Sequence, residues 1–97
     1  MELYSLESNG YNDGEYEDFD SFDMFYGVFS TIEKAKEYAE KLMEETREGN
    51  NNFVTGNWYE SGGILFKEVT YDDCGNDWTE TYSISRITVD PEFKEDK

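Results

Sequence analysis

Four stretches of the chain are rich in apolar and aromatic residues, which is typical of β-strands with side chains pointing to two faces in turn. These stretches are residues 2–7, 22–29, 64–71 and 78–89. Residues 22–29 have large apolar side chains on both faces of the expected strand. One face carries Phe25 and Phe29, and the other carries Phe22, Met24, Tyr26 and Val28. This pattern predicts a central strand, with a helix on one face and aromatic cover on the other.

Between residues 32 and 43 the apolar spacing changes to three and four, as in an amphipathic helix. Its apolar face carries Ile32, Ala35, Ala39, Leu42 and Met43. Ser30 and Glu33 have the spacing of a capping box, in which the serine hydroxyl accepts a hydrogen bond from a first-turn amide. Gly49 stands where a left-handed glycine closes many helices. The sequence therefore predicts a helix that is capped by Ser30 and closed by Gly49.

The segments between these elements are polar and contain turn residues. Residues 9–23 are expected to form a long acidic loop, and residues 72–77 a hairpin loop. Residues 53–59 are expected to add a short strand, and Pro91 to end the last strand. One face of that last strand carries Trp78, Tyr82, Ile84 and Arg86.

The resulting element order, β-β-α-(β)-β-β, defines the expected architecture. It predicts an α+β fold: a single antiparallel β-sheet of four to five strands with one amphipathic helix packed across it. The length of 97 residues allows one core of modest size. We expect a single small acidic domain over residues 1–97, with residues 90–97 as a flexible tail.

The charge balance narrows the possible partners. The chain has 24 Asp and Glu against 8 Lys and Arg, a formal net charge of -16, and residues 1–32 hold no base at all. Such a surface repels phosphates, so direct binding to nucleic acid or to an anionic membrane is not expected. No apolar run approaches the length of a membrane span, and residues 1–7 do not show the basic region and long apolar stretch expected of a signal sequence. We expect a soluble cytoplasmic protein.

Few residues are suited to catalysis or to metal binding. The chain has no His, and its lone Cys74 can form neither an internal disulfide nor a zinc site. The acidic segments near Asp13 and Asp72 lack the glycine and glutamate positions of an EF-hand loop. With the side chain that most often titrates near neutrality absent, we expect no enzyme activity, no cofactor and no dedicated metal site.

The acidic residues are the candidate binding residues, in two groups. The first group lies in the expected loop: Asp13, Glu15, Glu17, Asp18, Asp20 and Asp23, with Tyr16 and Phe19 between them. The second lies on the polar side of the helix: Glu33, Glu37, Glu40 and Glu44. The helical group also fits an ordinary solvated face, because Lys and Arg stand three or four residues from these acids. The aromatic side chains of the loop either join the core or form an aromatic and acidic binding patch.

Residues 26–31, Tyr-Gly-Val-Phe-Ser-Thr, are followed by Glu-Lys-Ala at 33–35. Here the chain resembles a class of small uncharacterised bacterial and phage proteins with an N-terminal strand, an acidic loop, a Gly-Val-Phe/Tyr-Ser-Ser/Thr strand end and a Glu-Lys-Ala helix start. The resemblance covers roughly residues 1–45 and implies a fold rather than an activity. By composition only, the chain is also similar to phage-encoded acidic anti-restriction and anti-CRISPR inhibitors.

These observations favour a non-enzymatic protein inhibitor, phage-encoded and acting in the host cytoplasm. Its carboxylates would mimic phosphates and block the basic nucleic-acid-binding surface of a host defence protein of the CRISPR or restriction type. The alternative is a small regulatory or immunity-type protein that binds one cognate protein through an aromatic and acidic patch. Homodimerisation by pairing of sheet edges is compatible with either function.

Overall fold

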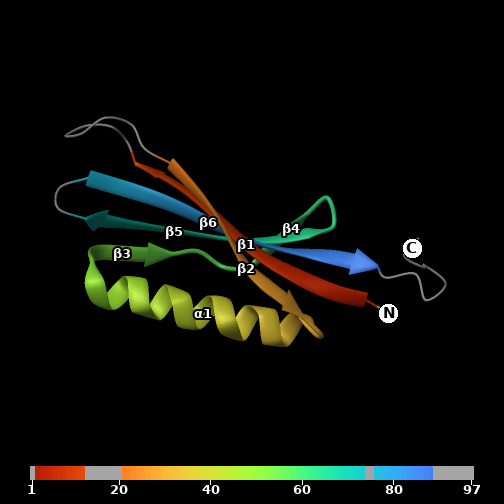
Figure 1. Cartoon of the computed structure of the whole chain (residues 1–97). Helices are drawn as coiled ribbons and strands as arrows, with labels where there is room; N and C mark the ends of the chain where they lie inside the picture. Colours follow the sequence, from red (N-terminus) through yellow and green to blue (C-terminus); the bar gives the residue numbers. More distant parts are fainter. Residues whose placement is uncertain (1, 13–20, 74–75, 89–97) are drawn as a thin grey trace, which may run out of the picture.

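A single helix packs across one face of an antiparallel sheet (Figure 1). The computed structural model describes residues 2–12, 21–73 and 76–88. Within them the elements are β1 (Glu2–Asn12), β2 (Ser21–Phe29), α1 (Ile32–Gly49), β3 (Asn51–Thr55), β4 (Tyr59–Ser61), β5 (Ile64–Asp73) and β6 (Asn76–Thr88). The predicted α+β fold is confirmed. These residues form six strands rather than four or five, because the short strand expected at 53–59 is divided into β3 and β4.

The sheet has the strand order β2-β1-β6-β5-β3, and β4 pairs with β5 beside β3. The first and last strands of the chain therefore lie together at the centre. Leu6 of β1 lies opposite Gly27 of β2 and Ile84 of β6, and Ile84 in turn lies opposite Leu65 of β5. This register places residues of the same face in rows across the strands.

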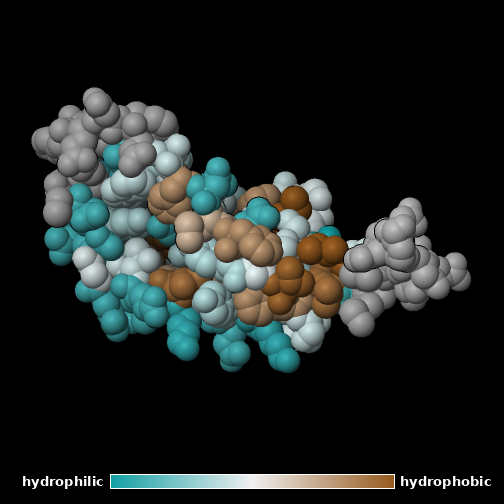
Figure 2. All heavy atoms as spheres, in the orientation of Figure 1, coloured by the Kyte–Doolittle hydropathy of each residue, from teal (hydrophilic) through white to brown (hydrophobic). Residues whose placement is uncertain are grey.

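The core lies between α1 and the sheet. Its fully buried hydrophobic residues are Leu6, Ala35, Ala39, Met43, Val69, Tyr82 and Ile84. The two alanines recur at four-residue spacing, so small side chains let the helix approach the strands closely. Figure 2 shows hydrophilic side chains along the lower edge of the molecule, where α1 runs in Figure 1. The predicted apolar face of the helix is therefore the face that packs on the sheet.

Both predicted helix caps are wrong by one residue. The N-cap is Thr31 rather than Ser30: its Oγ1 accepts a hydrogen bond from the Lys34 amide at 3.1 Å. At the other end α1 includes Gly49, and the C-cap Asn50 has an extended backbone. The Asn50 side chain donates to the Thr46 carbonyl at 3.0 Å, so an amide side chain replaces the left-handed glycine.

The predicted role of residues 22–29 is also wrong. They belong to β2, which is an edge strand and pairs only with β1 among the described residues. The register shifts between Leu6 and Glu7, where Tyr26 is the extra residue of a β-bulge. Tyr26 therefore faces α1 with Phe29, while Phe25, which was expected to share a face with Phe29, is 60% exposed on the opposite face. One inserted residue breaks the alternation that the prediction assumed.

Four strands are longer than predicted. Strand β1 continues to Asn12, so Tyr11 lies in a strand. Strand β2 begins at Ser21, β5 continues to Asp73, and β6 begins at Asn76. The polar residues Ser8 and Asn12 are buried in these extensions. Because they are not apolar, the hydrophobic pattern could not reveal them. The loop residues 13–20 and the proposed tail 90–97 lie outside the described residues.

Within the described part of the chain, no helix combines the length and the apolar character that crossing a membrane requires.

Candidate functional site

The helical acids predicted as binding residues are all exposed, but two of them have partners. Lys67 of β5 donates to Glu40 at 2.6 Å, and the Trp58 indole donates to the same oxygen at 3.0 Å. Arg47 forms two hydrogen bonds with Glu44, at 2.7 and 3.2 Å. These two carboxylates already have cationic partners, which favours a structural role for them.

Glu40 attaches the helix to the sheet. Burial favours the neutral carboxyl, but the hydrogen bonds from Lys67 and Trp58 and the charges of Lys67 and Lys36 outweigh it and lower the pKa of Glu40. The ammonium groups of Lys36 and Lys67 also lie 5.9 and 5.7 Å from the centre of the Trp58 ring. This cluster of opposite charges around an aromatic ring fixes one side of α1.

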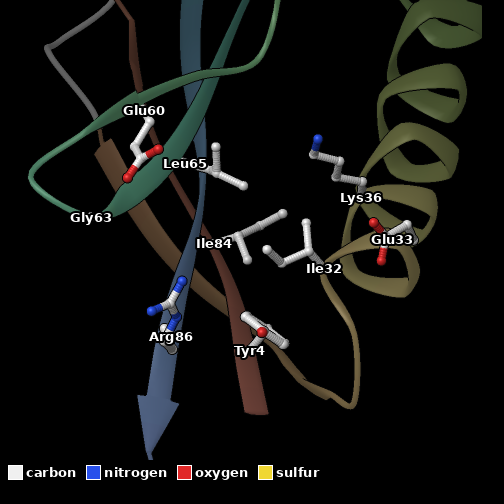
Figure 3. A pocket seen from close by; sticks show the side chains of 9 residues that line it. All are labelled: Tyr4, Ile32, Glu33, Lys36, Glu60, Gly63, Leu65, Ile84 and Arg86. Carbon is white, nitrogen blue, oxygen red and sulfur yellow. The ribbon is translucent and has the colours of Figure 1, made fainter. Parts of the chain in front are cut away.

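A pocket of about 260 Å³ opens where α1 begins (Figure 3). Glu33, another of the predicted binding residues, lies on its rim with Lys36, Glu60 and Arg86. The floor is apolar and is formed by Ile32, Leu65 and Ile84. Two acids and two bases balance each other around this rim, so the pocket has no marked preference for a basic partner.

The loop residues predicted to bind a partner lie mostly outside the described residues. These are Asp13, Glu15, Tyr16, Glu17, Asp18, Phe19 and Asp20. Asp23 is described: it belongs to β2 and lies opposite Asn9 of β1. Its side chain is exposed on the face of the sheet that α1 does not cover, which we call the open face.

The open face is the side of the sheet opposite α1. Its residues follow from the register, because directly paired residues lie on the same face. One row across it contains Phe25, Glu7, Ser83, Phe66 and Tyr59. The rings of Tyr59 and Phe66 stack at 5.6 Å. In the middle of the sheet, β6 carries small hydroxyl side chains on this face from Thr79 to Ser85.

Most of the exposed large hydrophobic residues lie on the open face. Of eight such residues in the described part of the chain, six are on this face: Tyr11, Phe25, Val28, Val54, Tyr59 and Ile87. Such a concentration on one face is typical of a protein-interaction surface, because scattered single residues are the norm elsewhere.

The charges of the open face all have one sign. It carries the acids Glu7, Asp23, Glu68, Asp72 and Asp77. The bases of the described residues lie elsewhere: Lys34, Lys36, Lys41 and Arg47 on α1, and Lys67 and Arg86 on the side of the sheet that faces α1. The open face therefore combines exposed aromatic residues with acids and, among the described residues, has no base.

The sequence contained a partial signal for this segregation. Arg86 was predicted to share a strand face with Tyr82 and Ile84, and both are in the core. Because the base Arg86 lies on the core-facing side of β6, the opposite side of this strand is left with mostly polar and acidic residues. What the pattern lacked was the separation of Phe25 from Phe29, because the bulge at Tyr26 places these two residues on opposite faces of the sheet.

A buried carboxylate lies under α1, on the other side of the sheet. Glu80 is 7% exposed and accepts a hydrogen bond from the Tyr71 hydroxyl at 2.8 Å. Its second oxygen has no hydrogen-bond partner among the described residues. Burial, and the nearby negative charge of Glu80, raise the pKa values of Tyr71 and Tyr82. This network is enclosed by core residues and therefore contributes to stability rather than to binding.

No group of three or more potential metal ligands occurs among residues 2–12, 21–73 and 76–88. Comparison of the chain with protein-family models, with curated proteins and with solved structures gave no match. The resemblance to small bacterial and phage proteins therefore stays a prediction.

Proposed function

We propose that this protein is a non-enzymatic binding protein that covers a basic surface of one partner protein with its open face. The observation that carries the proposal is the combination of six exposed large hydrophobic residues with five acids and no described base. Aromatic side chains supply contact area and cation–π contacts to Arg and Lys, and the acids select a partner of positive charge. Proteins that bind nucleic acids present basic surfaces of this kind.

The density of charge favours aromatic-centred binding over mimicry of a duplex. Asp23 and Glu68 lie in one row, separated by three strand spacings of about 4.8 Å, or about 14 Å in total. Duplex DNA carries one charge per about 1.7 Å of axis, or about eight charges over the same length. A row with two carboxylates is a poor substitute for eight phosphates, whereas its aromatic content suits an ordinary protein interface.

Phosphate mimicry is the second candidate, and the charge of the whole chain favours it. The net charge of -16 is large for 97 residues, and the acids of residues 13–20 would be its main contributors. In that case the protein would act as an inhibitor that competes with nucleic acid for Lys and Arg side chains, as expected for the anti-restriction and anti-CRISPR class.

Two basic peptides separate these functions: octalysine, and an octapeptide in which Lys alternates with Val. Attraction between charges alone favours octalysine, which has twice the charge. An aromatic-centred face should bind the Lys-Val peptide more tightly, and raising the salt from about 50 to 200 mM should weaken that complex less. Titration calorimetry at both salt concentrations measures the difference.

Variants of the protein complete the test. Phe25→Ser and Val28→Ser remove exposed apolar side chains from the open face and should weaken binding of the Lys-Val peptide several-fold. Asn57→Ser is the control, because Asn57 is also exposed but lies between β3 and β4, outside the strands of the open face. Tighter binding of octalysine, together with equal affinities of the three variants, would refute the proposal and favour mimicry.

A further inference from the structure

The outer edge of β2 is the longest unpaired strand edge in the described structure. Strand β2 has nine residues and pairs with β1 on one side only. No backbone hydrogen bond joins the outer edge of residues 22–29 to any described residue. Such an edge presents a row of amide and carbonyl groups that can pair with a further strand.

The opposite edge of the sheet is less suited to strand addition. Strand β3 has five residues, and its register against β5 shifts between Asn51 and Val54. Asn52 there has a φ of 57°, which an extended strand does not have. Strand β4 has three residues. An added strand would find only short, irregular pieces at that edge.

Edge strands are usually protected by Lys, by Pro or by bulges, and β2 has only the last of these. It contains neither Lys nor Pro, and its one charged residue is Asp23. The bulge at Tyr26 bends the edge but leaves pairing with β1 intact on both sides. Exposed apolar side chains stand along the edge: Phe25 and Val28 on the open face, and Met24 on the other.

The side chains on the two sides of this edge indicate the chemistry of the strand that would add to it. On the open face, Asp23 and the neighbouring Glu7 are acidic and Phe25 offers an aromatic ring. On the helix side, Met24 is exposed, and Tyr38 of α1 is exposed beside Phe29, with ring centres 5.5 Å apart. An extended segment with bases on one side and apolar residues on the other would complement both.

We propose that a partner protein adds an extended segment of alternating basic and apolar residues to the outer edge of β2. Its basic side chains lie on the open face beside Asp23 and Glu7, and its apolar side chains lie against Met24 and Tyr38. A second copy of this chain is a poorer occupant, because two chains of charge -16 repel each other. This inference rests on the proposed function and specifies how the basic partner binds.

Hydrogen exchange of the Lys-Val octapeptide complex gives the direct readout. Addition of the peptide should slow exchange of the outward-facing amides in residues 22–29 by roughly tenfold or more, because they gain hydrogen bonds. Amides of β3 should not change. Protection that spreads equally over both edges, or that is absent from β2, would overturn the inference. Protection that instead rises with protein concentration in the absence of peptide would mean that a second copy occupies the edge.

Two N-methylated forms of the peptide test the backbone contacts. One is methylated at its Lys amides and the other at its Val amides, so that each form blocks one edge of the extended peptide. Strand addition uses a single edge, so one form should bind roughly tenfold more weakly and the other almost normally. Equal affinities of the two forms would overturn strand addition.

A matched pair of protein variants distinguishes failure of strand addition at β2 from failure of the proposed function of the open face. Val28→Lys and Val54→Lys place the same charge on the same face at opposite edges, where the parent residues are 47% and 63% exposed. Strand addition at β2 predicts that Val28→Lys weakens binding of the Lys-Val peptide about fivefold or more and that Val54→Lys has little effect. Equal weakening by both would retain the open face as the binding surface and reject the edge of β2.

Discussion

The hydrogen bond between Tyr71 and Glu80 provides the strongest stability prediction. Replacing Tyr71 by Phe removes the hydroxyl group and almost nothing else. Glu80 is 7% exposed, and its other oxygen has no partner among the described residues, so the substitution removes the hydrogen bond, 2.8 Å long, that the Tyr71 hydroxyl donates to the carboxylate. A hydrogen bond to a charged group contributes about 1.5–3 kcal/mol. We therefore expect Tyr71→Phe to lower the free energy of unfolding by about 2 kcal/mol.

A double-mutant cycle tests whether this loss comes from the carboxylate. Glu80→Leu removes the buried charge and its unsatisfied oxygen, so it should cost less than removal of one partner from a retained charge. In the Glu80→Leu background, Tyr71→Phe should cost less than about 0.5 kcal/mol, because no carboxylate remains to be satisfied. The coupling between the two positions should then be about 1.5–3 kcal/mol.

Urea denaturation at pH 7 in about 150 mM salt measures these differences, and equal m-values would show that the denatured states are comparable. For a domain of this size, 2 kcal/mol corresponds to a decrease in Tm of about 8–16 °C. A loss below 0.5 kcal/mol for Tyr71→Phe, or the same loss in both backgrounds, would refute the assigned role of Glu80.

Three further predictions concern pH and the helix cap. Because the pKa values of Tyr71 and Tyr82 are raised, the folded state keeps two phenolic protons that the unfolded state loses near pH 10. The free energy of unfolding should therefore fall above pH 10, by up to about 1.4 kcal/mol per pH unit for each tyrosine. Denaturation curves at alkaline pH measure this decrease. The lowered pKa of Glu40 predicts a loss of stability in acid instead. Glu40→Gln should lower the free energy of unfolding by at most about 1 kcal/mol, because the Glu40 side chain is half exposed, and this loss should be the same from pH 7 to 5. It should disappear as the pH falls through the folded-state pKa, so an unchanged loss at pH 3 would contradict the prediction. Thr31→Ala should lower stability by about 1 kcal/mol and Ser30→Ala by less than half of that, whereas the reverse order in thermal melts would restore Ser30 as the cap.

The sequence determined the parts of this fold that depend on neighbours a few residues apart. The apolar spacing predicted the helix and the face that it buries, since Ala35, Ala39 and Met43 are all in the core. Stretches rich in apolar and aromatic residues located the strands, and the shared face of Tyr82 and Ile84 is a core face. These signals are local because helices and strands repeat over two to four residues.

The sequence did not determine which strands lie at the edge or how far they extend. A central position for β2 was expected from its two apolar faces, but its place in the sheet depends on the pairing of β1 with β6, whose paired residues are between 66 (Asn12 and Trp78) and 86 (Glu2 and Thr88) positions apart in the chain. The extension of β1 was invisible for a similar reason: Ser8 and Asn12 are polar, and only their cross-strand neighbours bury them.

The location of the candidate site could not be predicted from the sequence. Composition indicated an acidic surface, because charges can be counted without a structure, and the basic partner inferred from it stays a prediction. The tertiary structure decided that Glu40 and Glu44 have cationic partners and that Phe25 joins the acids of the open face. The physical reason for the position of Phe25 is the bulge at Tyr26: strand side chains alternate with a period of two, so one extra residue places Phe29, which follows it, on the side of α1 and leaves Phe25 with Asp23 on the open face.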